Sequence, residues 1–176
     1  MQPATFHRVT EAEYVEAERR ADRKSELING EAHATAGARP RHNRLAVRFS
    51  SAIERQIEAR GGPCMTFNSD QRVRVEATGM NAYPDVSVAC PPAFHETWRE
   101  ARVNPTVLVE VLSSSTEAYD RGAKFGHHQR LESLTDYVLV SQGDHRVEHF
   151  HRVGPGQWLL TALAGDDAVI DLASIG

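Results

Sequence analysis

The sequence predicts an α/β (α+β) fold in which a mixed central sheet is flanked by helices. Two apolar strand-like segments, 106–112 and 136–141, enclose a helical segment, and such a strand–helix–strand crossover joins parallel strands. Capping signals and four-residue apolar repeats indicate further helices, whereas short apolar segments bounded by turn residues indicate further strands. The length of 176 residues suits a single domain over residues 1–176.

The N-terminal segment predicts a helix followed by a hairpin. Thr10 and Glu13 form a capping-box pattern at the start of a helix that extends to about Arg23. Segment 26–34 carries Asn29-Gly30 between two strand-like halves. This dipeptide is typical of a type I′ turn, because both of its residues readily adopt positive φ.

A second helix is predicted from about residue 41 to residue 60, and it ends at a pair of glycines. Apolar residues recur at every fourth position and mark the buried face: Leu45, Phe49, Ile53 and Ile57.

Strands dominate the centre of the chain. Segments 64–67 and 71–76 are predicted to pair, and buried strands follow at 83–90 and 106–112. Ser114 and Glu117 form a second capping-box pattern, which predicts a third helix to about residue 131.

The end of the chain predicts further strands. Segment 136–141 is a buried strand, and segments 146–152 and 157–163 form an extra C-terminal β-hairpin.

Composition favours a protein of the cytoplasm. The net charge is -4, which argues against a protein whose whole surface binds nucleic acid. Cys64 and Cys90 form no CxxC motif and are expected to be reduced core residues. The first fourteen residues lack an apolar leader, and no segment approaches the roughly 20 apolar residues that cross a membrane.

Two carboxylates lie within predicted buried strands. Strand alternation places Glu110 on one face with Leu108 and Leu112, and Asp85 begins the strand that contains Val86 and Val88. A buried carboxylate requires a cation, a metal or several hydrogen-bond donors. Two such acids on neighbouring strands suit Mg²⁺ or Mn²⁺. The alternative for Glu110 is a structural ion pair with Lys124 or Arg121.

Lys124 lies in the helix that follows the Glu110 strand, and it is one of only two lysines in the chain. Its ammonium could stabilise charge on a phosphate. The alternative is a surface pair with Asp120, four residues earlier, worth about 0.2–0.5 kcal/mol. Gly122 and Gly126 would let this helix approach the sheet.

The second helix carries basic residues at its start. Arg41, Arg44, Arg48 and Arg55 fall on one stripe, which is either a solvated helix face or a phosphate-binding surface. His42 either packs in the core or faces a site at the helix start. As a nucleic-acid contact set we therefore expect Arg41, His42, Arg44 and Arg48.

The chain resembles the Uma family of restriction-endonuclease-like bacterial proteins, within the PD-(D/E)XK nuclease superfamily. The segments that carry the resemblance are SELINGE (25–31), His42, YPDVSV (83–88), NPTVLVEVLSSSTEAYDRGAKF (104–125) and DYVLVS (136–141). Together these segments span most of the chain, and the longest of them is the most specific.

The resemblance implies a restriction-endonuclease-like core and hydrolysis of phosphodiester bonds with Mg²⁺ or Mn²⁺. It implies Asp85 and Glu110 as metal ligands, Lys124 as the catalytic lysine and Glu26 as an additional acid. The implied partner is nucleic acid, in the first instance DNA, and a homodimer is implied as well. The chain departs from the (D/E)XK pattern, because Leu112 occupies the position where the pattern has lysine.

Three other interpretations remain open from the sequence. The chain could be a catalytically inactive module that binds nucleic acid or protein on a nuclease-like fold. His149 and His151 share one strand face, and with His127 and His128 they suggest a zinc or iron enzyme instead. Cys90 could serve a cysteine hydrolase, although no His or Asp partner can be assigned to it.

Overall fold

The computed structural model describes residues 8–35, 37–165 and 167–175. Residues 1–7 of the segment expected to lack a leader therefore lie outside the described residues. The helices are α1 (Glu11–Glu18), α2 (Pro40–Arg60), α3 (Glu117–Tyr119) and α4 (Phe125–His128), with a π-helical segment at Asp120–Lys124 and a 3-10 turn at Ala173–Ile175.

The strands form two sheets, one of six and one of five strands. The six-stranded sheet has the order β11-β10-β9-β8-β6-β3, with bounds Gln157–Ala164, Arg146–Gly154, Asp136–Ser141, Val107–Leu112, Val86–Ala89 and Met65–Asn68. The five-stranded sheet has the order β2-β1-β5-β4-β7, with bounds Glu31–Ala34, Ser25–Ile28, Met80–Ala82, Arg72–Val75 and Ala101–Arg102. The predicted mixed α+β architecture is confirmed, and the five-stranded sheet is an addition to it.

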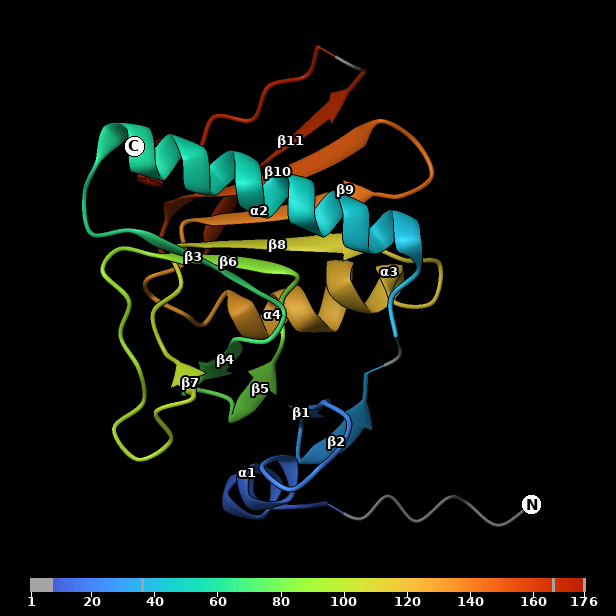
Figure 1. Cartoon of the computed structure of the whole chain (residues 1–176), viewed down its shortest axis with the longest axis vertical. Coiled ribbons are helices and arrows are strands. Elements are labelled where there is room, and N and C mark those ends of the chain that lie inside the picture. Colours follow the sequence, from blue (N-terminus) through green and yellow to red (C-terminus); the bar gives the residue numbers. More distant parts are fainter. Residues whose placement is uncertain (1–7, 36, 166, 176) are drawn as a thin grey trace.

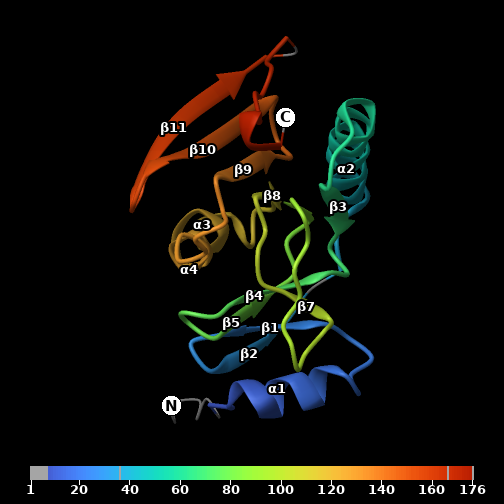
Figure 2. The same cartoon turned by 90° about the vertical axis from the view of Figure 1, so that its left-hand side faces the viewer.

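The six-stranded sheet is mixed, as predicted. β8 and β9 are parallel, whereas β9–β10, β10–β11, β8–β6 and β6–β3 are antiparallel. The crossover that joins β8 to β9 contains α3 and α4. Figure 2 shows α2 on one side of this sheet and the crossover helices on the other, and Figure 1 shows the five-stranded sheet and α1 beneath them.

Strand alternation separates two apolar cores. Leu108 and Leu112 of β8 pack with the crossover helix and with the five-stranded sheet. Val107, Val109 and Val111 face Ile53 and Ile57 of α2, together with the C-terminal segment that contains Leu172 and Ile175. The predicted faces of β8 and of the second helix are therefore confirmed.

The local N-terminal signals are also confirmed. Thr10 accepts a hydrogen bond from the amide of Glu13, and the Glu13 carboxylate accepts one from the amide of Thr10. Asn29 and Gly30 have φ of 51° and 81°, as the predicted turn requires. The helix ends at Glu18 rather than at Arg23, and the Glu18 carboxylate accepts hydrogen bonds from Ser25 of β1.

Two predictions for the centre of the chain are wrong. β3 pairs with β6 rather than with β4, and β4 belongs to the other sheet. The Ser114–Glu117 capping box does not form, because the Glu117 amide bonds to the carbonyl of Ser113. The predicted third helix does form, over residues 117–128 without a break, but it is π-helical at Asp120–Lys124, a segment called the π-turn below.

The expectation of two reduced cysteines is also wrong. Cys64 and Cys90 form a disulfide. They flank the antiparallel β3–β6 pair, in which Met65 lies opposite Ala89, so they face one another across the two strands. The sequence could not show this, because it did not indicate that β3 pairs with β6.

Reduction of this disulfide is expected to destabilise the protein by about 3 kcal/mol, because the bond closes a loop over a sequence separation of 26. Urea denaturation with and without dithiothreitol measures the difference. A Cys64→Ser, Cys90→Ser variant is the matched control, since reduction should not change its stability. Two reactive thiols in the unreduced, unfolded protein would contradict the disulfide.

Within the described part of the chain, no helix combines the length and the apolarity needed to cross a membrane.

Candidate active site

Lys124 lies at the centre of a buried cluster of carboxylates. Its Nζ is 2.9 Å from Glu110 Oε1, 3.2 Å from Glu26 Oε1 and 3.7 Å from Asp120 Oδ1. All four residues are buried. The predicted lysine and the predicted acids Glu110 and Glu26 therefore meet, although they are far apart in the sequence.

Three elements build this cluster. β8 presents Glu110 on the face that it shares with Leu108 and Leu112, and β1 presents Glu26, whose carboxylate accepts a hydrogen bond from the amide of Tyr83. The π-turn carries both Asp120 and Lys124, and the carbonyl of Asp120 accepts a hydrogen bond from the Tyr137 hydroxyl at 3.0 Å. Such π-turns recur at functional sites.

The glycines of the crossover do not bring Lys124 to the sheet. A side chain at Gly122 or Gly126 would meet nothing within 4 Å, so the predicted close approach at these positions is wrong. The buried side of the π-turn instead directs Lys124 and Asp120 inward, and Phe125 packs beside them in the core.

Asp85 is held by a strand and by a helix. Its Oδ2 accepts a hydrogen bond from the amide of Val111 at 2.7 Å. Its Oδ1 lies 2.8 Å from Nε2 of His42, in the first turn of α2. These contacts leave lone pairs on both oxygens, because a carboxylate can accept about four hydrogen bonds. His42 therefore faces the site, one of the two interpretations that the sequence allowed.

Burial and charge shift the pKa values of the cluster. Burial raises the pKa of Glu110 well above its ordinary value, against the attraction of Lys124. Burial alone would lower the pKa of Lys124, but Glu110, Glu26 and Asp120 together raise it well above its ordinary value. Burial also raises the pKa of Asp85 and of Asp120. Lys124 thus remains an ammonium at neutral pH.

The carboxylates outnumber their cation. One ammonium contacts three carboxylates in this cluster. Glu110 Oε1 is buried and lies 2.9 Å from Nζ of Lys124, an ion pair in which this oxygen accepts no hydrogen bond. The ion pair remains, but a buried oxygen without a hydrogen bond, in a cluster with more carboxyl groups than cations, suits a divalent cation.

The structure decides between the two proposed ion pairs of Glu110. Lys124 contacts Glu110, whereas the guanidinium of Arg121 contacts Glu117 and Glu148. The pair with Arg121 is therefore excluded. The Lys124–Asp120 pair is not a surface pair, because both side chains are only 6% exposed.

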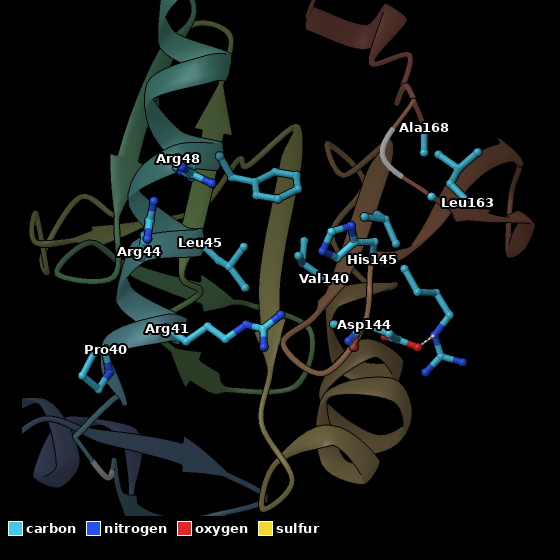
Figure 3. Close-up of a pocket in the computed structure, with 15 residues that line it drawn as sticks. Pro40, Arg41, Arg44, Leu45, Arg48, Val140, Asp144, His145, Leu163 and Ala168 are labelled. Atoms are coloured by element: carbon cyan, nitrogen blue, oxygen red, sulfur yellow. Dashed lines mark hydrogen bonds and ion pairs between the residues drawn. The ribbon is translucent and has the colours of Figure 1, made fainter.

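One cleft of about 2140 Å³ exposes the cluster to ligands. Its lining contains the predicted set of Glu26, Asp85, Glu110 and Lys124, and it also contains Arg41 and His42. Arg41, Arg44 and Arg48 line a second cavity of about 680 Å³, between α2 and the start of β10 (Figure 3). The structure therefore divides the predicted nucleic-acid contact set between two hollows.

Sequence reasoning missed two members of the site. Asp120 appeared only as a surface partner of Lys124, and its position four residues before the lysine was the available signal. Tyr119 lines the same cleft with a buried hydroxyl that has no hydrogen-bond partner. Nothing in the sequence pattern distinguished it from an ordinary helix tyrosine.

The fold and this cluster define the chain as a restriction-endonuclease-like protein. The Uma2 family, described as "Putative restriction endonuclease", matches residues 11–175, and the chain belongs to this family. The predicted family assignment is therefore confirmed.

Two relatives in Synechocystis sp. are similar along most of their length. Uncharacterized protein sll1609 is 39% identical over 171 residues, which cover 97% of this chain and 96% of the relative. Uncharacterized protein slr1290 is 35% identical over 173 residues, which cover 98% of this chain and 89% of the relative.

A solved structure shares the fold. The crystal structure of a "putative nuclease belonging to DUF820" from Anabaena variabilis matches with a TM-score of 0.73 and 15% identity. The match covers 92% of this chain and 90% of that chain. At this identity the match supports the fold alone.

Proposed function

We propose that the protein is a metal-dependent endonuclease that hydrolyses phosphodiester bonds of DNA. The observation that carries this proposal is the contact between Lys124 and Glu110, at 2.9 Å. The chain lacks a lysine at position 112, and the ammonium supplied by the π-turn occupies the site instead.

The residues of the cleft fit a divalent metal. Asp85 and Glu110 would hold it, since Mg²⁺ and Mn²⁺ take one or two carboxylates and keep several waters. When bound, such an ion would polarise the phosphate and lower the pKa of a bound water. The unsatisfied oxygen of Glu110 and the excess of carboxylates support this assignment.

Each side chain then has a distinct role. Lys124 would stabilise negative charge on the phosphorane-like transition state, and its own charge lowers the pKa of Glu110 against the effect of burial. The contact of His42 with Asp85 fixes the direction of that carboxylate. Arg41, at the rim of the cleft, would contact the nucleic-acid backbone, while Arg44 and Arg48 extend this basic surface along α2.

The proposal also includes the location, the domain organisation and the oligomeric state of the protein. We place the protein in the cytoplasm, where a disulfide such as Cys64–Cys90 is rare, as one domain over residues 1–176, and we expect a homodimer. The remaining candidate is an inactive binding module on the same fold, in which the Lys124 cluster is purely structural.

Cleavage of supercoiled plasmid tests the proposal, with single-stranded DNA and RNA assayed in parallel and Mg²⁺ or Mn²⁺ added. We expect metal-dependent cutting of the plasmid and a loss of at least about 100-fold in Glu110→Gln. Glu76→Gln is the matched control, because the side chain of Glu76 is 81% exposed. If no substrate is cut under any of these conditions, the endonuclease proposal fails and the binding module replaces it.

A further inference from the structure

A second group of metal-ligating side chains lies away from the proposed active site. Asp136, at the start of β9, faces His149 and His151 of β10. One ligand atom from each of the three residues lies within 4.8 Å of the other two, the arrangement expected of a metal site. Among the described residues, no such set of three includes Asp85 or Glu110.

The pairing of two antiparallel strands builds this group. His151 lies directly opposite Asp136, and His149 lies opposite Val138. Residues 136 and 138 share one face of β9, so both imidazoles point to that face. Asp136 Oδ1 is 2.7 Å from Nε2 of His149 and 2.8 Å from Nδ1 of His151.

This group is on the opposite face of the sheet from Lys124. Val138 and Val140, which lie on the same face of β9 as Asp136, pack in the core beneath α2. Glu110 belongs to the other face, with Leu108 and Leu112. The two sites therefore share the sheet but no ligand.

The carboxylate is oriented by a separate set of contacts. Its other oxygen, Oδ2, accepts hydrogen bonds from the hydroxyls of Thr135 and Ser174. These contacts direct Oδ1 toward the imidazoles, in the way that outer hydrogen bonds orient metal ligands. Ser174 belongs to the C-terminal turn, so the group also ties the end of the chain to the sheet.

Charge and access both suit a metal. Asp136 is fully buried, and its ion-pair partners in the described part of the chain are these two imidazoles. A buried carboxylate is stabilised by a nearby full positive charge, which a bound metal ion would supply. The side chain of His151 is 43% exposed, which leaves an open direction for entry and for a water ligand.

We propose that Asp136, His149 and His151 form a transition-metal site, with zinc as the ion of first choice. Two imidazoles and one carboxylate suit zinc and related first-row metals, whereas Mg²⁺ prefers oxygen ligands alone. The site is independent of the proposed nuclease chemistry. Bound metal would link β9 to β10 and, through the Ser174 contact, to the C-terminal segment.

Zinc titration of the chelator-treated, full-length protein tests this site. We expect one zinc ion per chain by calorimetry and by elemental analysis after dialysis, and no competition from Mg²⁺. His151→Ala and His149→Ala should lose this ion. His33→Ala, in which an exposed histidine is removed from β2, and Asp85→Asn should keep it.

Two further measurements separate the metal site from a hydrogen-bonded cluster. Nitrogen chemical shifts of the histidine rings should move at Nε2 of His149 and at Nδ1 of His151 when zinc is added. Ser174→Ala keeps all three ligands and should bind zinc about 10–100-fold more weakly. The inference is wrong if wild-type protein binds no stoichiometric zinc. It is equally wrong if His151→Ala keeps the zinc while Asp85→Asn loses it.

Discussion

Replacement of Lys124 with methionine is expected to lower the free energy of unfolding by about 3–5 kcal/mol at neutral pH. The change removes the ammonium that contacts Glu26, Glu110 and Asp120 and leaves their buried negative charges without it. Urea denaturation measures the loss. In the wild-type protein, the stabilisation that Lys124 provides is present below its ordinary pKa of 10.5 and is lost as the pH rises through its higher pKa in the folded state.

The chain provides a matched control in its other lysine. Lys24 contacts the carbonyl of Ser69 and the carboxylate of Asp70, and its side chain is 38% exposed. Lys24→Met should therefore cost no more than about 1 kcal/mol. Equal losses of unfolding free energy in Lys124→Met and Lys24→Met would contradict the conclusion that Lys124 stabilises a buried carboxylate cluster.

The Lys124→Met variant should become more stable as the pH is lowered. Burial raises the pKa of Glu110, so the folded state holds a proton more tightly than the unfolded state does. Unfolding then releases protons, and the stability of Lys124→Met should increase as pH falls toward 4.5, the ordinary pKa of this carboxyl.

The rate of DNA cleavage by Lys124→Met, measured at a temperature where the variant is folded, should fall by about 10²–10³-fold relative to the wild-type rate. A variant that cuts DNA at the wild-type rate would limit Lys124 to a structural role.

Asp85→Asn is expected to weaken Mn²⁺ binding by at least about 100-fold, and plasmid cleavage with it. An amide oxygen is a poorer ligand than a carboxylate, but it can still accept the hydrogen bond from Val111. We therefore expect the fold to be retained, so that the loss reports on the site. Calorimetric titration with Mn²⁺ measures the affinity.

Two further variants are needed to interpret the Mn²⁺ affinity of Asp85→Asn. His42→Ala keeps the carboxylate but removes the contact with Oδ1, and it should weaken Mn²⁺ binding by about 10–100-fold. Asp70→Asn removes an exposed carboxylate and should leave the Mn²⁺ affinity unchanged. If Asp85→Asn binds Mn²⁺ as well as wild-type protein does, Asp85 is not a ligand.

Local sequence signals predicted much of the framework. The Thr10 capping box, the Asn29-Gly30 turn and the faces of β8 each depend on residues within a few positions of one another. Backbone preferences and side-chain periodicity act over that distance, so the sequence expresses them directly. The prediction of a Ser114 capping box also depended on neighbouring residues, but it was wrong. The amide of Glu117 donates its hydrogen bond to the carbonyl of Ser113 instead.

The candidate site was predictable in part for the same reason. A carboxylate in a buried strand needs a cation or a metal nearby. The sequence alone therefore indicated Asp85 and Glu110 as candidate ligands and Lys124 as a candidate cation. Whether Lys124 reaches Glu110 depended on the π-turn, which has no local sequence signal here. Asp120 lies in that turn and Tyr119 directly precedes it, and both line the cleft.

The sequence by itself determined the strand faces, the crossover between β8 and β9 and the presence of acids that require a cation. The tertiary structure alone decided three pairings between distant residues: Lys124 with Glu26, Cys64 with Cys90, and Asp136 with two histidines. The physical reason is that periodicity fixes which face a side chain occupies, whereas strand order fixes what it meets there. Strand order results from the packing of the whole chain, and no short segment encodes it.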